Sequence, residues 1–489
     1  MHRILTAHAP GRPCGFLRLG QFLPIRNVWP LLPRETLVDL VDLKSGRLAP
    51  DAYERHFGDA HSPLNRTQAL IEAERCYYCY AAPCQTACPT GIDIPAFIQR
   101  VAQDNLRGAA EAILTANPLG GMCARVCPTE VLCEQACVRN THESKPVEIG
   151  LLQRYAVEGH WDRPGRPLFE RAAPTGRRVA VVGAGPAGLA AAHGLAWRGH
   201  DVVLFDAAPK LGGLNEYGLA TYKVAGGFAQ REIDWLLSIG GITPQLNCRL
   251  GRDITLDGLL ADFDAVFLGL GLSGVNALGI AEPELPGLQS RVRDAVDFIA
   301  ELRQHPPQTV AVGRKVVVIG GGMTAVDAAV QSKLLGAEQV TMVYRRGPES
   351  LSASQHEQQW AQTHGVTIRC WARPVAIEAT GVRLAATAVR GGLLVDTGEE
   401  FFVEADMVLR AIGQTYEPAA ALELNSGRIK TDEDGRTSQP RVWAGGDCRF
   451  GGRDLTVEAV EHGKRAAASI DRELGLAAVR HLDKEAAHG

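Results

Sequence analysis

The sequence predicts an α/β protein in which an all-helical N-terminal domain precedes two Rossmann-like domains, the second inserted into the first. Three observations support this fold class. Two separate segments read as a buried strand, a glycine-rich turn and a helix. Eight of the twelve cysteines fall within residues 76–137, and the text around them places apolar residues at helical spacing. The elements are justified in turn below.

Length and composition limit the classes of protein to be considered. A chain of 489 residues suggests about three domains, and 46% hydrophobic with 22% charged residues is typical of globular proteins. A net charge of -4 offers no basic surface for nucleic acid. No apolar run approaches the roughly 20 residues of a membrane-spanning helix, and no secretory signal core is present. We therefore expect a cytoplasmic protein with no nucleic-acid or membrane partner.

The cysteines form two runs. The first is Cys76-x2-Cys79-x4-Cys84-x3-Cys88-Pro, and the second is Cys123-x3-Cys127-Pro with Cys133-x3-Cys137 after it. Runs of this kind hold iron–sulfur cubanes, and in two-cluster proteins the cysteine before proline ligates the other cluster. Structural zinc usually takes two short Cys-x-x-Cys pairs, and disulfides need an oxidising compartment. Two 4Fe-4S clusters, and with them a one-electron relay, fit the spacing best.

The region around the cysteines is predicted to be helical. Residues 1–34 contain five Arg, five Pro and no Asp or Glu, so we expect a flexible arm there. Residues 35–73 and the segment between the two runs show helical spacing, with Asp93 as an N-cap and Pro95 in the first turn. A short helix is predicted at 148–155. We therefore expect a helical double 4Fe-4S domain over 35–165, dependent on its clusters for folding.

A dinucleotide fingerprint follows a Pro/Gly-rich linker. The apolar strand at 179–182 runs into Gly183-x-Gly185-x-x-Gly188, then an Ala-rich helix and a strand that ends at Asp206. The first glycine makes the turn, the second lets the backbone approach a pyrophosphate, and the third lets the helix pack on the strand. Asp206 is placed to bind a ribose hydroxyl, and the helix N-terminus favours the phosphates.

A second fingerprint has Gly320, Gly322 and Ala325 at the same three positions, but its following strand ends in Arg345 and Arg346 rather than in an acid. A carboxylate would repel a 2′-phosphate, whereas arginine would accept it. The two arginines after this strand therefore favour NADP. The alternative interpretation is that both arginines lie at a solvated strand end.

The first domain is predicted to resume after the second. Residues 441–448 read as a short strand and a turn that ends in Asp447, and a helix opens near Thr456 with its dipole free to face an electron-rich ring. The predicted boundaries are 172–286 and 408–489 for the two parts of the first domain, and 287–407 for the inserted one.

Two fingerprints behind a double cysteine run, in this order and spacing, resemble the small subunit of glutamate synthase and the N-terminal half of dihydropyrimidine dehydrogenase. The resemblance covers roughly residues 40–475. It implies FAD at the first fingerprint, NAD(P)H at the second, and clusters that pass electrons to a separate substrate-reducing module. Dihydropyrimidine dehydrogenases use a glutamine as the last ligand of one cluster, and here that position is Gln153. The sequence therefore most resembles the electron-input subunit of a bacterial two-subunit dihydropyrimidine dehydrogenase.

The resemblance also implies the cofactor ligands. It assigns one cluster to Cys76, Cys79, Cys84 and Cys137, and the other to Cys88, Cys127, Cys133 and Gln153. Cys123 would then be a neighbour, whereas a count of thiolates would use Cys123 and leave Gln153 idle. The FAD contacts expected from fingerprint and resemblance together are Val126, Gly183, Gly185, Pro186, Ala187, Gly188, Asp206, Gly212, Gly213, Leu214, Lys223, Gly446, Asp447 and Thr456. The nicotinamide-nucleotide contacts expected are Gly320, Gly322, Met323, Thr324, Arg345, Arg346, Ala411, Ile412 and Gly413.

The coenzyme stays open because the sequence departs from the family pattern. Met323 stands where the families usually have Asp, and Ser352 stands where NADP-using pyrimidine enzymes place a third basic residue. The bacterial two-subunit enzymes favour NADH, toward which we lean slightly.

The implied function is oxidation of NAD(P)H with transfer of electrons through FAD and both clusters, and no acid–base residue is required on this chain. The chain ends at Gly489, too soon for an FMN-binding barrel. We therefore expect a hetero-oligomer with an FMN- and iron–sulfur-containing subunit that reduces uracil or thymine. Alternatives are a glutamate synthase small subunit or related electron-input protein, and a non-enzymatic redox or iron sensor.

Overall fold

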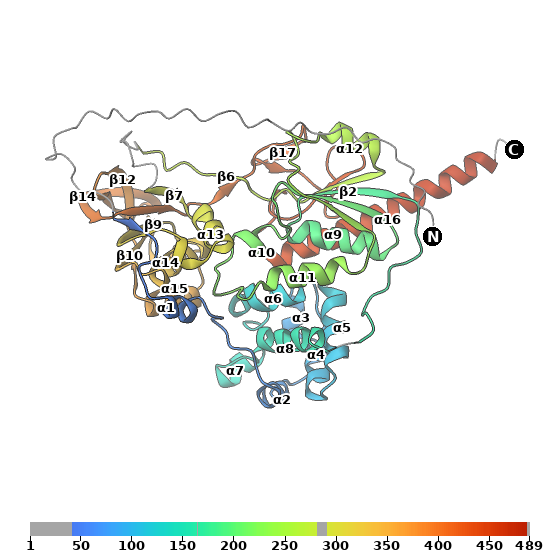
Figure 1. Ribbon diagram of the computed structural model, residues 1–489, viewed down its shortest axis with the longest axis horizontal. Helices are drawn as coiled ribbons and strands as arrows, with labels where there is room; N and C mark the ends of the chain where they lie inside the picture. Colours follow the sequence, from blue (N-terminus) through green and yellow to red (C-terminus); the bar gives the residue numbers. More distant parts are fainter. Residues whose placement is uncertain (1–41, 164, 281–290, 487–489) are drawn as a thin grey trace, which may run out of the picture. The chain divides into compact units, whose positions relative to one another are not determined.

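The computed structural model describes residues 42–163, 165–280 and 291–486, with side chains described as far as Gly475. The predicted arm at 1–34 lies outside the described residues. Among those described, an all-helical segment is followed by two five-stranded parallel sheets, each with its own helices (Figure 1). The predicted fold class is confirmed, including the insertion of the second sheet into the first domain.

The helical domain surrounds the cysteines. Its helices are α2 (Arg66–Glu74), α3 (Pro83–Ala87), α4 (Ile94–Ala102), α5 (Leu106–Ala116), α6 (Gly120–Val126), α7 (Arg139–Glu143) and α8 (Ile149–Trp161), with a 3-10 turn η1 (Thr129–Val131). Asp93 caps α4 as predicted, because its side chain accepts a hydrogen bond of 3.1 Å from the Ala96 N–H. Phe97, Ile113 and Leu152 lie in its buried core. The helix predicted at 148–155 continues to Trp161 as α8.

Residues 43–57, which precede the helical domain, pack against the inserted domain. The helical spacing predicted from residue 35 is wrong at β1 (Leu43–Lys44), which pairs antiparallel with β8 (Val312–Gly313); residues 35–41 are outside the described range. In α1 (Pro50–His56) and just after it, Tyr53 and Phe57 join the core of the inserted domain. Pairing across the chain overrode the local spacing, and we propose that the helical domain begins near Asn65 rather than at 35.

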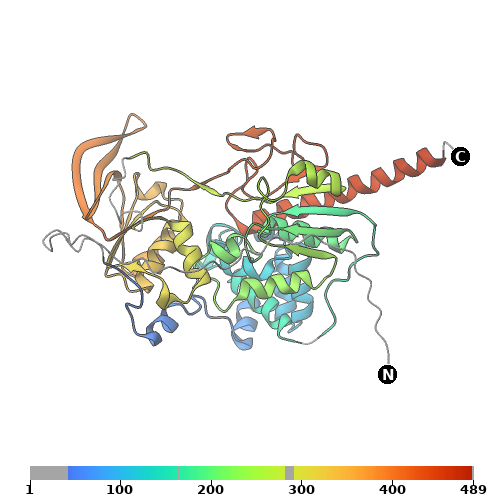
Figure 2. The same cartoon turned by 45° about the horizontal axis from the view of Figure 1, so that its top comes forward.

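The first sheet has the strand order β19-β5-β2-β3-β4 and is parallel throughout. Its strands are β2 (Arg178–Val182), β3 (Asp201–Phe205), β4 (Ile242–Gln245), β5 (Ala265–Leu268) and β19 (Val442–Ala444). The helices α9 (Pro186–Trp197) and α16 (Thr456–Ala486) run side by side (Figures 1 and 2). They touch so closely that a Cβ on Gly463 would lie 2.1 Å from the Ala187 carbonyl oxygen. The remaining elements of this domain are α10 (Leu214–Tyr217), α11 (Phe228–Leu237), α12 (Leu256–Asp262), β17 (Leu424–Asn425) and β18 (Arg428–Ile429).

The second sheet has the order β11-β10-β9-β15-β7. Its strands are β7 (Val292–Asp294), β9 (Lys315–Ile319), β10 (Gln339–Val343), β11 (Val366–Arg369) and β15 (Met407–Arg410). Other elements are α13 (Ala295–Gln304), α14 (Met323–Leu334), α15 (Gln355–Thr363), η2 (Pro307–Thr309), η3 (Pro348–Ser350) and the antiparallel strands β12 (Ala372–Glu378), β13 (Gly381–Arg390) and β14 (Leu393–Glu404).

The chain crosses between the two sheets on paired strands. β6 (Gly274–Val275) leaves the first domain and pairs antiparallel with β16 (Gln414–Thr415), which returns to it. Because β15 bonds to β7 and β9, the predicted boundary at 407/408 falls inside a strand of the second sheet. We propose that the first domain resumes after Arg410.

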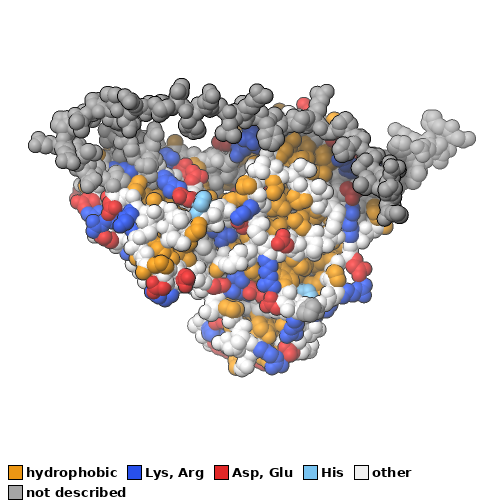
Figure 3. Space-filling view, viewed as in Figure 1, with side chains coloured by type: hydrophobic (Ala, Val, Ile, Leu, Met, Phe, Trp, Pro, Cys, Tyr) orange, Lys and Arg blue, Asp and Glu red, His pale blue; other side chains and the backbone are white. Residues whose placement is uncertain are grey.

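On the face shown in Figure 3, basic and acidic side chains are interspersed among the described residues. Within the part of the chain that the structure describes, no helix has both the length and the apolar character needed to cross a bilayer.

Candidate redox site

Three glycines allow the backbone of the turn between β2 and α9 to pack closely on one side and leave space on the other. Gly183 has φ +94°, and a Cβ there would lie 2.1 Å from the Gly269 carbonyl oxygen. A Cβ on Gly188 would lie 1.8 Å from the Gly183 carbonyl oxygen, so α9 approaches β2 as closely as a backbone can. At Gly185 the nearest atom to a Cβ would be the Gly213 Cα at 3.9 Å. The site therefore has two tight positions and one that faces open space, where a pyrophosphate would need room.

The other expected flavin contacts gather around this turn. Gly212 and Gly213 precede α10, and the Gly212 N–H donates to the Ala184 carbonyl oxygen at 2.9 Å. Gly446 follows β19, and a Cβ on it would lie 3.4 Å from the Ala187 side chain. Thr456 begins α16, and its hydroxyl donates to Asn215 Oδ1 at 2.9 Å. Pro186 and Ala187 form the first turn of α9.

Two carboxylates lie in this region. Asp206 Oδ2 accepts from the Ala184 N–H at 2.6 Å, and Oδ1 accepts from the Ala208 N–H at 2.7 Å. Burial raises the pKa of Asp206, against the two backbone donors that favour its charge. Burial, helped by Asp454, raises the pKa of Asp447 to about 6. Asp206 thus stands at the strand end with its oxygens fixed beside the glycine turn, as a ribose-binding acid requires.

The second fingerprint opens onto a cavity of about 820 Å³. A Cβ on Gly320 would lie 2.1 Å from the Ala411 carbonyl oxygen, so this turn is also closed by a neighbouring backbone. All but one of the expected nicotinamide contacts line the cavity: Gly320, Gly322, Met323, Thr324, Arg345, Ala411, Ile412 and Gly413. The exception is Arg346; both arginines are exposed, but only Arg345 is among the residues that line the cavity. Of the two arginines, only Arg345 is placed to meet a bound nucleotide.

A separate cavity of about 340 Å³ brings the three domains together. The helical domain contributes Val126 and Cys127 to its lining. The first nucleotide domain contributes Leu214 and Thr456, and the inserted domain contributes Met323. A cluster cysteine, expected flavin contacts and an expected nicotinamide contact therefore surround one space.

A cluster of buried charged side chains from two domains forms part of the lining of this cavity. Lys223 Nζ lies 2.8 Å from Asp327 Oδ1 and 2.8 Å from Glu357 Oε1, and both acids come from the inserted domain. The Tyr222 hydroxyl donates to the same Asp327 oxygen at 3.1 Å. Burial alone would lower the pKa of Lys223, but Asp327 and Glu357 outweigh it and raise that pKa above its usual value. Lys223 is therefore a cation that links the two domains.

Four cysteines line a small cavity of their own. They are Cys76, Cys79, Cys84 and Cys137, the set that the resemblance implies for one cluster. Ile94, Ile98 and Val147 form its apolar wall. Burial raises the pKa of the Cys84 thiol to about 11, so without a metal this side chain would keep its proton. Iron would supply the charge that stabilises it as a thiolate.

The other cysteines lie close to this first set. Hydrogen bonding to Cys123 and burial raise the pKa of Cys127, and its neighbours include Cys133 and Cys88. Cys84 in turn acts electrostatically on Cys133, so the two sets adjoin. A hydrogen bond of 3.3 Å joins Cys88 Sγ to the Thr90 hydroxyl.

Both candidates for the fourth ligand of this second set are buried. Gln153 is 7% exposed, and its Nε2 donates to the Gly120 carbonyl oxygen at 2.6 Å. That bond leaves Oε1 as the atom of this amide suited to bind iron. Cys123 is 3% exposed and lies beside Cys127. Cys123 thus lies beside Cys127, and Gln153 is bonded to the first residue of α6, the helix that leads into Cys127, so both stay candidates.

Within residues 42–163, 165–280 and 291–486, no three Cys, His, Asp or Glu side chains converge as ligands of a single metal ion would. A cubane has other requirements, because each thiolate binds a different iron atom and the ligands are spread around the cluster. Two adjoining groups of partly buried thiols, one of them around a cavity, fit that requirement better than a one-ion site.

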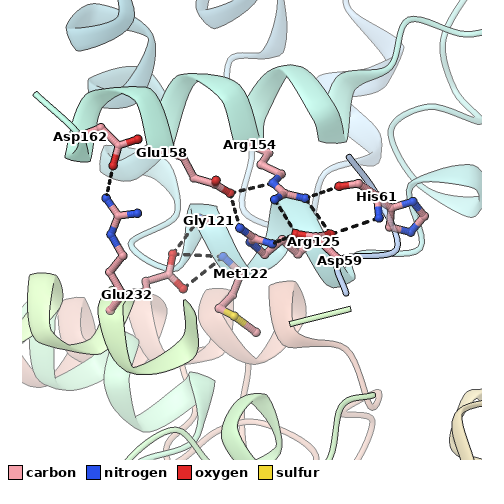
Figure 4. Close-up of polar contacts among 10 residues, drawn as sticks. Asp59, His61, Gly121, Met122, Arg125, Arg154, Glu158, Asp162 and Glu232 are labelled. Carbon is pink, nitrogen blue, oxygen red and sulfur yellow. Dashed lines mark hydrogen bonds and ion pairs between the residues drawn. The ribbon is translucent and has the colours of Figure 1, made fainter. Parts of the chain in front are cut away.

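Buried charges join the helical domain to α11 (Figure 4). Glu232 Oε1 accepts from the Gly121 N–H at 2.7 Å and from the Met122 N–H at 3.1 Å, both in the first turn of α6. Burial raises the pKa of Glu232 to about 8. Nearby, Arg125 and Arg154 share the acceptors Asp59 and Glu158. This network holds α6, which leads into Cys127.

The comparisons with known proteins agree with this geometry. Residues 53–164 match the family described as dihydropyrimidine dehydrogenase domain II, 4Fe-4S cluster. Residues 177–463, more than half of the chain, match pyridine nucleotide-disulphide oxidoreductase. The chain belongs to the pyridine nucleotide-disulphide oxidoreductase family. The expected cofactor set of 4Fe-4S, FAD and NAD(P)H is confirmed at this level, and the chain is a flavin-dependent NAD(P)H oxidoreductase.

Relatives within this family include both predicted subunit types. The glutamate synthase [NADPH] small chain of Escherichia coli K12 is 34% identical over 445 residues, which cover 85% of this chain and 93% of that one. The NAD-dependent dihydropyrimidine dehydrogenase subunit PreT of the same strain is 35% identical over 408 residues, covering 83% and 94%. The predicted resemblance is confirmed. Mycobacterium tuberculosis FprA in complex with NADPH shares the fold, with TM-score 0.54 and 20% identity over 63% of this chain and 89% of FprA.

Sequence reasoning missed residues that act across domains. Asp327 and Glu357 pair with Lys223 over more than 100 residues of chain, and Glu232 reaches α6 over a similar separation. No local pattern in the sequence predicts such long-range ion pairs and hydrogen bonds. Thr90 could have been found, because it follows the Cys88-Pro89 step within a ligand run.

Proposed function

We propose that this chain is the electron-input subunit of a dihydropyrimidine dehydrogenase. It would take electron pairs from NAD(P)H and deliver single electrons to a partner subunit that carries FMN and iron–sulfur centres and reduces uracil or thymine. The observation that carries the proposal is the 340 Å³ cavity, because residues expected to hold flavin, nicotinamide and a cluster all line it. Flavin supplies the exchange between two-electron and one-electron chemistry.

The residues would act as holders and tuners in this function. The turn at Gly183–Gly188 and Asp206 would hold the FAD pyrophosphate and ribose, and Thr456 would direct the α16 dipole toward the flavin ring. Cys76, Cys79, Cys84 and Cys137 would hold one cluster. Cys88, Cys127 and Cys133 would hold the other with Gln153, whose neutral oxygen would change that cluster's charge and hence its potential.

The choice of partner rests on the relatives. PreT is named as a subunit of an NAD-dependent dihydropyrimidine dehydrogenase, which supports a hetero-oligomer for this chain. A glutamate synthase small chain is the second candidate, supported by an identity of 34%. Gln153 favours the first, because the resemblance assigns a glutamine ligand to the pyrimidine enzymes and Glu to the glutamate synthases.

The test is reconstitution under anaerobic conditions. The holo-chain is titrated with NADH and NADPH, alone and mixed with a candidate FMN-containing subunit, and uracil reduction is assayed. Uracil reduction only in the mixture is the expected result, and it would also identify the coenzyme. Uracil reduction by the chain alone would contradict the need for a partner. Flavin bleaching without uracil reduction in any mixture would favour the glutamate synthase alternative.

A further inference from the structure

The loop around the first two cysteines, Cys76 and Cys79, exposes an aromatic surface. Among the described residues, eleven large apolar side chains are exposed, and four of them fall within residues 71–80. Tyr77 and Tyr78 are 52% and 38% exposed, and Tyr80 is fully exposed. Ile71 of α2 adds to the same stretch. Three exposed tyrosines in four positions are costly in water and typical of recognition surfaces.

Specific contacts hold this loop in place. Tyr78 has φ +49°, a left-handed conformation that a residue of this size seldom adopts outside functional sites. The turn directs the Tyr78 N–H to Cys76 Sγ at 3.4 Å, and the Tyr78 hydroxyl donates to the Ala73 carbonyl oxygen at 3.3 Å. The Arg139 guanidinium lies 4.0 Å from the centre of the Tyr77 ring. The rings of Tyr77 and Tyr78 are thus held beside a cysteine sulfur, and Tyr80 follows directly after Cys79.

The loop also stands at the far end of the cysteine groups from the flavin cavity. Tyr77 lines the four-cysteine cavity together with Cys76 and Cys79, whereas Cys127 of the other set lines the 340 Å³ cavity. Figure 1 shows α2 and α7, which flank the loop, at the end of the helical domain away from α6. Electrons that enter beside Cys127 would therefore reach the Cys76 group last.

We propose that the surface of Tyr77, Tyr78 and Tyr80 is where the electron acceptor docks, and that its occupant is the iron–sulfur-bearing face of the partner subunit. Electron exchange between proteins falls steeply with the distance between centres, so an acceptor must sit close to the last donor. Redox encounters use small interfaces, for which a few rigid aromatic anchors suffice. This inference rests on the proposed function and adds the contact surface to it.

A charge-swap experiment tests the surface without the native partner. Cytochrome c is the probe, because it is a basic protein that accepts single electrons. Tyr80→Glu should raise the second-order rate of its reduction several-fold at low ionic strength, and Tyr80→Lys should lower it similarly, with both effects lost at high salt. Leu393 of β14, 71% exposed, is the matched control as Leu393→Glu and Leu393→Lys, which should change nothing. Equal rates for both Tyr80 variants, or equal effects at Leu393, would overturn the proposal.

A second readout needs no turnover. An anionic dysprosium chelate should relax the electron paramagnetic resonance signal of one reduced cluster more strongly in Tyr80→Lys than in Tyr80→Glu, because the added charge attracts or repels the chelate. Relaxation that is the same in both variants for both clusters would overturn the surface. A failure of the proposed function would show earlier and differently, as a wild-type flavin that NADH does not bleach or as the absence of cluster signals.

Discussion

The two nucleotide-binding domains share the same order of strand, glycine turn and helix, and they differ in the side chains placed to contact the ligand. Both begin with a strand of five residues, a glycine turn and a helix of twelve residues. The first requires Gly188, whose Cβ would strike the turn, whereas the second carries Ala325 at the same position. Asp206 directly follows β3 in the first domain, whereas Tyr344 directly follows β10 in the second and Arg345 comes next. A shared backbone motif thus fixes where a dinucleotide lies, and one or two side chains determine which dinucleotide it is.

The domains also differ in how they are fastened. The flavin domain meets the helical domain through Glu232, which accepts hydrogen bonds from the first turn of α6. The nicotinamide domain is held to the flavin domain through Lys223 and its two acids, and it takes Tyr53 and Phe57 into its core. One junction therefore rests on buried hydrogen bonds, and the other on both charge and apolar packing.

The largest effect is expected from Gly188→Ala. The new methyl group would lie 1.8 Å from the Gly183 carbonyl oxygen, so α9 would have to move away from β2. We expect a loss of about 3 kcal/mol in unfolding free energy, at the upper end of overpacking effects, and loss of bound flavin. Thermal unfolding and the flavin-to-protein ratio measure both. The matched change Ala325→Gly should cost only about 1 kcal/mol. A Gly188→Ala protein with full flavin content would show that the two turns are equally tolerant.

Asp327→Asn should have the next largest effect. It removes one of the two acids around Lys223 and leaves the cation with Glu357 alone. Because breaking a buried pair costs roughly 3 kcal/mol, urea unfolding should show a loss approaching that value. The control Glu301→Gln breaks the more exposed pair with Arg293 and should cost less than about 1 kcal/mol. Equal losses would mean that the junction has no special role.

Arg345→Ala tests the coenzyme reading. If Arg345 meets a 2′-phosphate, its loss should raise the KM for NADPH about tenfold, the equivalent of one charge-assisted hydrogen bond, and leave the KM for NADH nearly unchanged. Steady-state reduction of ferricyanide with each coenzyme gives both values. Arg346→Ala, outside the cavity, should alter neither. An unchanged ratio in Arg345→Ala would mean that the arginine is a solvated strand end.

A different kind of effect, seen as a slope of stability against pH, is expected at Glu232. Its folded-state pKa of about 8 lies above that of a free glutamate. The stability contributed by its protonated form is therefore complete below about pH 4.5 and is lost as the pH rises toward 8 and beyond. Glu232→Gln should flatten the decline in unfolding free energy between pH 6 and 9, as measured by urea unfolding at each pH. A parallel decline in both proteins would show that Glu232 ionises normally.

Local patterns in the sequence were sufficient for the architecture. The glycine spacing places both turns, Asp93 caps its helix as predicted, and the helix near Thr456 begins there. Such features depend on neighbours a few residues away, which a sequence displays. The boundary predicted at 407/408 falls within β15, whose partners β7 and β9 lie more than 80 residues away along the chain, where local patterns give no information.

The sequence predicted which cysteines come together at the candidate site, but not the charged residues around it. Cys76, Cys79, Cys84 and Cys137 line one cavity as the resemblance implied. Arg346 was expected at the nucleotide with Arg345, but it does not line the cavity; both arginines lie in the bend after β10, whose geometry the strand pattern does not determine. Asp327 meets Lys223 only because two domains pack together, and no residue spacing in the sequence predicts this ion pair.

The central claim is that one chain joins NAD(P)H oxidation to two one-electron centres. Anaerobic titration of the holo-chain with NADH, followed by flavin absorbance and electron paramagnetic resonance together, tests it most directly. The account predicts bleaching of the flavin and the appearance of two reduced-cluster signals in the same titration. Flavin bleaching with no cluster signal, or cluster signals that only an external reductant produces, would contradict it.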